Sequence, residues 1–173
     1  TFSDFMREKI NEFNFKPEYR NIEHFSSSYV ENHKKKKISF SAKKVLINEE
    51  IIIPEGYNLN IEAGSKIIFS EKGKLITYSA INFNGTEEDP ILVSSANVIA
   101  KYNKDINQNI TIIDVQEKSV INNTAFKNLY GPLVNSGNGI TGVINVYNSN
   151  ILIKNSIFDT NFQSDDFLNI INS

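Results

Sequence analysis

Two segments near the end of the chain repeat one residue pattern at a fixed distance. Residues 144–149 read INVYNS and residues 168–173 read LNIINS, so the pattern returns after 24 residues, from 144 to 168. A period of this size is typical of a solenoid, in which each repeat buries its apolar residues against its neighbours. Because the repeat consists of short β-rich runs and turns without a helical pattern, it predicts an all-β fold, a right-handed parallel β-helix with coils of about 24 residues.

A second pair of segments repeats at a longer distance. Residues 152–158 (LIKNSIF) match residues 120–126 (VINNTAF), 32 residues earlier. The additional eight residues are assigned to residues 131–142, because four Gly and one Pro in twelve residues indicate a loop. Insertions in solenoids form loops on one face, which is often the binding face. Asn135 and Asn138 in this loop are therefore candidate ligand-binding residues.

Composition excludes several classes of protein. The 18 Lys and Arg residues are balanced by 20 Asp and Glu residues, so no overall positive charge predicts a nucleic-acid partner. Without Cys, the chain has neither disulfides nor Cys-based zinc sites. No apolar run reaches the length of roughly 18 residues needed to span a membrane, and no signal-peptide pattern is present at Thr1. Since the chain begins with Thr and stops within a repeat, we expect it to be part of a longer protein.

Residues 1–37 differ from the rest of the chain and are predicted to form an N-terminal helical cap or linker. The spacing of five apolar residues predicts one face of an amphipathic helix: Phe2, Phe5, Met6, Ile10 and Phe13. Such a helix would cover the open end of a β-helix, where strand edges and apolar core need protection. The alternative is a helix that docks on another domain. Residues 33–37 (HKKKK) indicate a solvated linker or, alternatively, a patch for polyanions or phospholipids.

Residues 38–173 are predicted to form the β-helix. Short β-rich runs are separated by turn sequences such as PEG at 54–56 and AGS at 63–65. The predicted strands up to residue 93 are 38–40, 45–47, 51–53, 59–61, 66–69, 75–78, 81–83 and 91–93. An antiparallel sandwich would also contain short strands and frequent turns, but nothing in a sandwich requires identical 24-residue steps.

The repeated Asn residues are interpreted as structural. Asn tolerates a left-handed backbone and bonds its own backbone in tight turns. Stacked coils also place equivalent amides above one another, where they can pair in a ladder. The predicted ladder pairs are Asn145 with Asn169 and Asn148 with Asn172.

Asp165 and Asp166 are the most suggestive acidic pair. Paired carboxylates can bind Ca²⁺, contact a sugar or hydrolyse a glycoside. Adjacent strand residues point to opposite faces, however, so the pair is interpreted first as a polar turn that leads into the strand at 167–171, with a metal or sugar contact and then catalysis as the alternatives. Tyr147 is a further candidate ligand residue, because a binding surface needs aromatic side chains beside polar groups. The repeats contain no His, and no catalytic, metal-binding or cofactor motif is present.

Two parts of the chain resemble known bacterial β-helix proteins. Residues 51–86, with IIIPEG, LNIEAGSKI, LITYS and NGT, resemble the opening coils of bacterial right-handed β-helices. Residues 141–171, with TGVINVYNS and SDDFLNII, are similar to the β-helix region of bacterial proteins related to spore-coat protein H (the CotH kinase-like group). This resemblance implies a β-helix associated with a larger bacterial protein. The kinase-like domain itself lies outside these residues.

Together these observations predict a non-catalytic structural or interaction module, a rigid β-helix stalk with a protein or carbohydrate partner and without a cofactor. The alternative is a β-helix that binds or cleaves an acidic polysaccharide through residues 131–142, Asp165 and Asp166. The fold alone favours the cell surface or an extracellular location. Arginine-rich or acidic catalytic clusters such as those of pectate lyases and polygalacturonases, which share the fold, are not matched.

Overall fold

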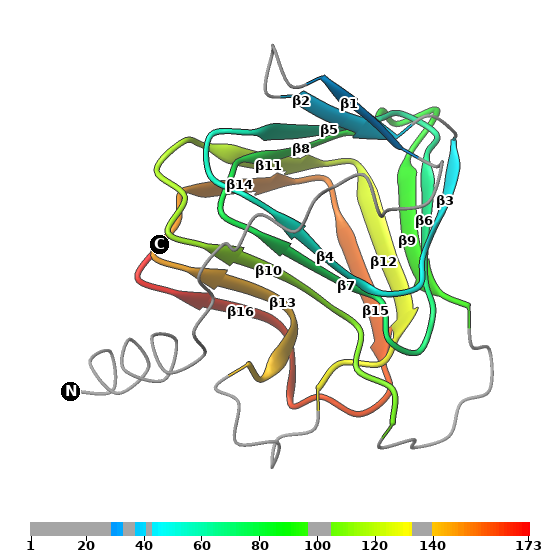
Figure 1. Ribbon diagram of the computed structural model, residues 1–173. Helices are drawn as coiled ribbons and strands as arrows, with labels where there is room; N and C mark the ends of the chain where they lie inside the picture. The colour runs from blue at the N-terminus through cyan, green and yellow to red at the C-terminus, as the bar shows by residue number, and fades with distance from the viewer. Residues whose placement is uncertain (1–28, 33–36, 41–42, 97–104, 133–139) are drawn as a thin grey trace.

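The computed structural model describes residues 29–32, 37–40, 43–96, 105–132 and 140–173 (Figure 1). These residues form strands and turns and contain no helix. The predicted amphipathic helix, most of the 1–37 segment, and Asn135 and Asn138 lie outside the described residues.

The strands form three sheets, here called A, B and C. Sheet A contains β1 (Tyr29–Asn32), β2 (Lys37–Phe40), β5 (Asn58–Glu62), β8 (Ile81–Asn84), β11 (Ser119–Asn122) and β14 (Ile151–Lys154). Sheet B contains β3 (Lys44–Ile47), β6 (Lys66–Phe69), β9 (Ile91–Ser95), β12 (Thr124–Leu129) and β15 (Ile157–Asn161). Sheet C contains β4 (Glu50–Ile53), β7 (Lys74–Thr77), β10 (Asn109–Ile113), β13 (Gly142–Tyr147) and β16 (Asp166–Ile171).

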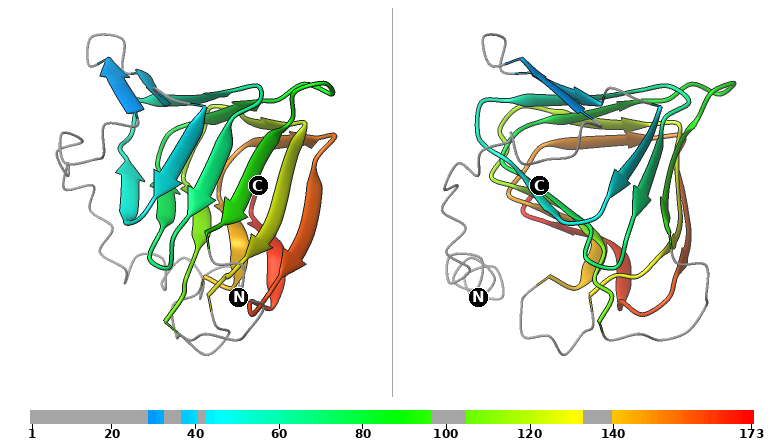
Figure 2. Two further views of the ribbon diagram at one scale, coloured as in Figure 1. Left: turned by 90° about the vertical axis from the view of Figure 1, so that its right-hand side faces the viewer. Right: turned by 45° about the vertical axis from the view of Figure 1, so that its right-hand side comes forward.

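From β2 onward the chain visits sheets A, B and C in turn, and each strand pairs in parallel with the equivalent strand of the next coil. Figure 2 shows the three walls of stacked strands from two further directions. Only β1, among the described strands, runs antiparallel to its neighbour, β2. The predicted parallel β-helix is therefore confirmed, and β1 adds a hairpin at the N-terminal edge of sheet A.

The strand register reproduces the two repeats seen in the sequence. Ile144 pairs with Leu168 and Tyr147 with Ile171, which is the predicted 24-residue step. Phe126 pairs with Phe158, which is the 32-residue step. Coil length varies elsewhere because the turns differ in length. Sheet C, for example, advances by 34 residues between Ile110 and Ile144.

Inward-pointing side chains fill the tube between the walls. Alternate strand residues are buried, as in β3 and β6, where an exposed or half-buried position precedes each buried one. Phe83, Phe126 and Phe158 stack along the axis, with ring centroids 6.3 and 5.2 Å apart. This arrangement follows from the period of two in a strand together with the parallel register, which places equivalent residues above one another.

The turns that leave sheet C share one backbone conformation in the last three coils. Asp114, Asn148 and Asn172 follow β10, β13 and β16 and have φ values of 54°, 47° and 54°. Asp and Asn are the non-glycine residues that most readily adopt this left-handed geometry. These stacked turns form the corner between sheets C and A, where the cavity described next is found.

Candidate functional site

The structure does not bring the predicted ligand residues to one place. Tyr147 ends β13, whereas Asp166 begins β16 and lies in register with Gly142 at the start of β13. The five strand steps between Gly142 and Tyr147 correspond to about 16 Å. Tyr147 therefore lies at the corner between sheets C and A, and the two Asp residues lie at the corner between sheets B and C.

Asp165 and Asp166 belong to a hydrogen-bonded turn that leads into β16. The Asn161 amide Nδ2 donates to the Ser164 and Asp166 carbonyl oxygens at 2.8 and 3.2 Å. The Asn161 Oδ1 atom accepts from the Gln163 and Ser164 backbone N–H groups. Both Asp side chains are exposed. The geometry here is that of a polar turn closed by an Asn side chain.

The repeated Asn residues bond mainly to their surroundings. Asn145 is fully buried, and its amide exchanges hydrogen bonds with the Gly142 N–H and C=O groups at 3.0 and 2.7 Å. Asn169 lies in register with Asn145 and donates to Thr141 Oγ1 at 2.7 Å. Asn148 donates to Asp114 Oδ1 at 2.7 Å, so a side-chain bond links these two stacked turns.

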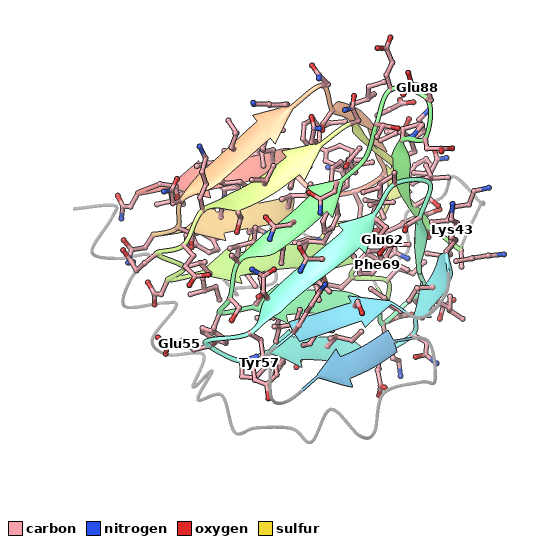
Figure 3. The ribbon with its side chains drawn as sticks, turned by 90° about the horizontal axis from the view of Figure 1, so that it is seen from above. Lys43, Glu55, Tyr57, Glu62, Phe69 and Glu88 are labelled. Atoms are coloured by element: carbon pink, nitrogen blue, oxygen red, sulfur yellow. The ribbon has the colours of Figure 1, made fainter. Side chains whose placement is uncertain are left out.

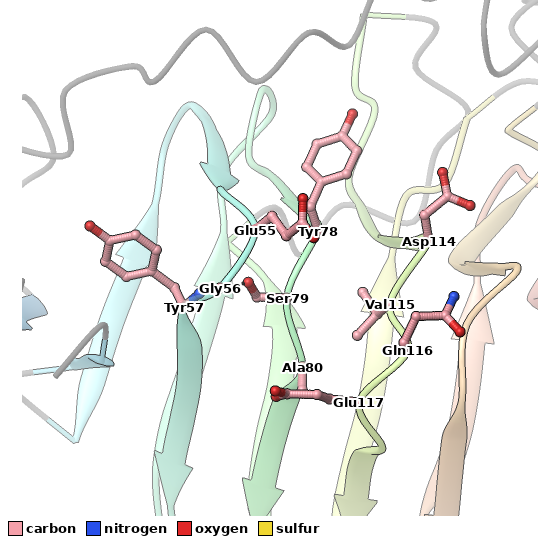
Figure 4. A pocket seen from close by; sticks show the side chains of 10 residues that line it. All are labelled: Glu55, Gly56, Tyr57, Tyr78, Ser79, Ala80, Asp114, Val115, Gln116 and Glu117. Carbon is pink, nitrogen blue, oxygen red and sulfur yellow. Dashed lines mark hydrogen bonds between the residues drawn. The ribbon is translucent and has the colours of Figure 1, made fainter.

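A cavity of about 220 Å³ lies at the corner between sheets C and A. Three successive turns line it: Glu55, Gly56 and Tyr57 after β4; Tyr78, Ser79 and Ala80 after β7; and Asp114, Val115, Gln116 and Glu117 after β10. Figure 4 shows these side chains arranged across three neighbouring coils. In Figure 3, which looks onto sheet A, Glu55 and Tyr57 lie where its strands begin, and Glu62 lies where β5 ends. We call this cavity the corner pocket.

Hydrogen bonds between coils hold the floor of the corner pocket. The buried Ser79 hydroxyl donates to the Pro54 carbonyl at 2.6 Å and accepts from the Tyr57 N–H at 2.9 Å. The Val115 N–H in turn donates to the Ser149 hydroxyl of the next coil at 3.0 Å. Because these bonds use groups that would otherwise be unpaired at the turns, they fix the turn after β4 to the turn after β7, and the turn after β10 to the turn after β13.

The corner pocket is acidic. Its lining includes three carboxylates, Glu55, Asp114 and Glu117, and neither Lys nor Arg. Burial, followed by the negative charges of Asp114 and Glu50, raises the pKa of Tyr78 to about 12. The Tyr78 hydroxyl therefore keeps its proton at physiological pH. The site offers carboxylate acceptors beside two aromatic rings, which suits a positively charged group.

The described part of the chain contains no group of three or more His, Cys, Asp or Glu residues arranged to hold a metal ion. The three carboxylates of the corner pocket thus do not form such a group. Among the same residues, no helix has the length and apolarity that crossing a bilayer requires.

Sequence reasoning missed the corner pocket. Its three acidic residues are separated by 59 and 3 positions along the chain, and Tyr78 lies between the first two. The available signal was that each lining segment directly follows a strand of sheet C. Aligning the turns after residues 53, 77 and 113 would have placed Glu55, Ser79 and Val115 close together.

Comparison with known proteins supplies no further identification. No protein-family model matches the chain, and no curated protein or solved structure shows a significant match.

Proposed function

We propose that this chain is a non-catalytic interaction module, a rigid β-helix whose corner pocket receives a basic side chain of a protein partner. The observation that carries the proposal is the lining of the pocket, which includes three acidic residues and two Tyr residues but no basic residue. Carboxylates pair with ammonium or guanidinium groups, and aromatic faces attract cations.

The size of the pocket supports a side chain rather than a larger ligand. Its volume of about 220 Å³ is below the range of roughly 300–1,000 Å³ that is usual for small-molecule sites. A single Lys or Arg side chain is a ligand of suitable size and charge. An acidic polysaccharide, the alternative from the sequence, would place its carboxylates against Glu55, Asp114 and Glu117, where like charges repel one another.

The proposal extends to the context of the module. A right-handed coil is the hand expected of parallel strands joined by crossover connections. A role as a stalk in a larger bacterial protein, at the cell surface, follows from the habit of the fold and from the resemblance of residues 141–171 to the β-helix region of the spore-coat protein H group.

A titration tests the pocket. The full chain is titrated with n-butylammonium and with methylguanidinium, and backbone amide shifts are followed by NMR. We expect saturable shifts confined to residues 55–57, 78–80 and 114–117. The variant Asp114→Asn/Glu117→Gln should lose them, because it removes two of the three carboxylates from the lining.

The matched control is Glu87→Gln/Glu88→Gln, which removes two exposed carboxylates from the turn before β9. This control should bind both probes as the unchanged chain does. If both double variants weaken the shifts equally, the effect is general charge screening and the proposed pocket is wrong. Shifts that never saturate would lead to the same conclusion.

A further inference from the structure

The outer face of sheet B is open to solvent and combines basic with aliphatic side chains. In its strands, residues that point into the tube alternate with residues that point outward. The strand pairing places the outward residues in two rows, which run from β3 to β15. One row is Lys44, Lys66, Leu92, Ala125 and Ile157, and the other is Leu46, Ile68, Ser94, Lys127 and Asp159. We call this surface the B face, and the left view of Figure 2 looks onto it.

Exposed aliphatic side chains and lysines lie together on the B face. Leu46 is 49% and Ile157 is 58% exposed, and among the described residues only Ile170 of sheet C is a comparably open large apolar residue. Lys44 and Lys66 are both exposed and pair in register, about 4.8 Å apart. Three lysines against one aspartate give the face an excess of positive charge. Such a surface is typical of an interaction site, and its charge favours an acidic partner.

The corner pocket lies on the opposite side of the coil. Because the chain visits sheets A, B and C in turn, the corner between C and A is the one that sheet B does not border. In Figure 1 the turns after β4, β7 and β10 lie on the left, and sheet B lies on the right. The lining of the pocket includes Glu55, Asp114 and Glu117 and no basic residue. One molecule therefore presents an acidic site and a basic face in opposite directions.

We propose that the partner of the corner pocket is a second copy of this chain, which inserts Lys44 or Lys66 of its B face into the pocket. This inference rests on the proposed function, which assigns a basic side chain to the pocket. A lysine carries its ammonium group on a long flexible stem, so it can enter a small cavity and pair with carboxylates there. The charges of the two surfaces are complementary, with two exposed lysines on one and three acidic residues on the other.

The spacing of the two surfaces supports a side-by-side arrangement with parallel coil axes. Lys44 and Lys66 belong to neighbouring coils, and turns from three neighbouring coils line the pocket. Both surfaces therefore advance by one strand separation, about 4.8 Å, from coil to coil. When one lysine occupies the pocket, the other lies over an adjacent turn of the same acidic lining.

This contact joins two different surfaces, so it leaves a free pocket on one copy and a free B face on the other. Since these surfaces point in opposite directions, further copies add to an open row. One corner against part of one face is a small contact, which places it among the weak interfaces that bury less than about 1,200 Å². Association should therefore increase with protein concentration and decrease with salt, which screens the charges.

Sedimentation velocity of the full chain tests the inference. Over about a hundredfold range of concentration, the average sedimentation coefficient should rise past that of a dimer. It should return to the monomer value in about 1 M NaCl, where the Debye length is about 3 Å. Because n-butylammonium occupies the pocket, it should reverse the association more strongly than the same concentration of sodium chloride.

Two variants separate the two surfaces. Lys44→Gln/Lys66→Gln removes charge from the B face and keeps the pocket, whereas Asp114→Asn/Glu117→Gln does the reverse. Circular dichroism verifies that both remain folded. Each variant alone should stay monomeric. An equal mixture should form one-to-one heterodimers and nothing larger, because each heterodimer uses the only intact pocket and the only intact B face that it contains.

The matched control is Lys72→Gln/Lys154→Gln, which removes two exposed lysines outside the B face and should associate as the unchanged chain does. Three results would overturn the inference. A chain that is monomeric at every concentration has no such contact, and association that stops at a dimer identifies a symmetric contact instead. A mixture of the two folded variants that stays monomeric shows that the pocket and the B face do not meet.

The n-butylammonium titration separates this inference from the proposed function. Saturable shifts in a chain that stays monomeric leave the pocket as a site for a basic side chain and exclude only the second copy as its partner. A chain that associates but shows no saturable response to n-butylammonium uses another contact, and this result contradicts both proposals.

Discussion

Sheets A and C are walls of the same coil, yet their outer faces differ. Asn60 and Asn82 point outward from sheet A in register, are partly exposed, and both donate to Asn58 Oδ1 at 2.9 Å. At the equivalent place in sheet C, every residue of β10 and β13 is buried. The inward faces of the two sheets are alike. Leu59 and Ile61 of β5 belong to the same apolar core as Ile110 and Ile112 of β10.

The difference shows that the β-helix fold requires apolar side chains only in the rows that face into the tube. A strand that is apolar on both faces is typical of a sheet covered on both sides, whereas strict alternation is typical of a wall open to water. In sheet C all of β10 and β13 is buried, although the outer face includes the polar residues Thr111 and Asn145, whereas the strands of sheet A alternate between buried and more exposed positions. The outer rows thus differ between the two walls, and the middle of sheet C is closed to solvent on both faces.

The largest expected effect comes from a charge on the outer row of each wall. Ile113→Asp places a carboxylate on the outer face of sheet C, where Ile113 is only 3% exposed, and should cost about 3 kcal/mol or more of unfolding free energy. Val120→Asp places the same carboxylate on the outer row of sheet A, where the side chain is half-buried, and should cost about 1 kcal/mol. Urea unfolding followed by circular dichroism measures both. Equal losses would show that the two walls are equally open.

A smaller effect is expected when an outward Asn is replaced on each wall. Asn145→Leu leaves the N–H and C=O of Gly142 without their side-chain partner inside a covered surface and should cost about 1–3 kcal/mol. For Asn82→Leu, water replaces the lost bond to Asn58, so the cost should stay below about 1 kcal/mol. The same unfolding experiment applies. A larger loss for Asn82→Leu would reverse the assignment of the covered wall.

Alkaline pH should destabilise the folded chain through Tyr147, at the end of β13 in sheet C. Burial raises the pKa of Tyr147 from 10.0 to about 12. In the unfolded chain Tyr147 loses its proton near its ordinary pKa, so its stabilising contribution is complete below pH 10 and is lost as the pH rises toward 12. Denaturant midpoints across this range should fall less steeply in Tyr147→Phe than in the unchanged chain. Identical slopes would mean that Tyr147 ionises as freely as in the unfolded chain.

The smallest effect is expected at an exposed turn outside both walls. Asp165→Asn/Asp166→Asn should change the unfolding free energy by no more than about 0.5 kcal/mol, because both side chains are exposed. The unchanged chain should cleave neither pectin nor alginate, with or without Ca²⁺, in an assay for unsaturated or reducing sugar ends. Cleavage that the double variant abolishes would make the acidic pair catalytic and remove the interaction module as the leading function.

The strands and their stacking could be read from the amino-acid sequence. All eight runs predicted between residues 38 and 93 overlap a strand from β2 to β9, and the 24- and 32-residue steps reappear in the pairing of β13 with β16 and of β12 with β15. This was possible because a parallel coil places like residues above like residues, which leaves a repeat in the sequence. The apolar outer row of sheet C was also present in the sequence, but a run such as III at 51–53 does not by itself say which faces are covered.

The corner pocket was decided by the tertiary structure alone. Glu55, Tyr78 and Asp114 meet because the turns after three strands of sheet C stack, although the second step, from 78 to 114, is longer than the first, from 55 to 78. An insertion adds residues to one coil without shifting the strands that follow, so spacing along the chain does not reveal which turns become neighbours. Tyr147 is separated from Asp165 and Asp166 because it ends a strand of sheet C, whereas the two Asp residues lie at the start of the next strand of that sheet. Repeating local patterns specify the coil, whereas contacts between turns depend on loop lengths that only the folded chain resolves.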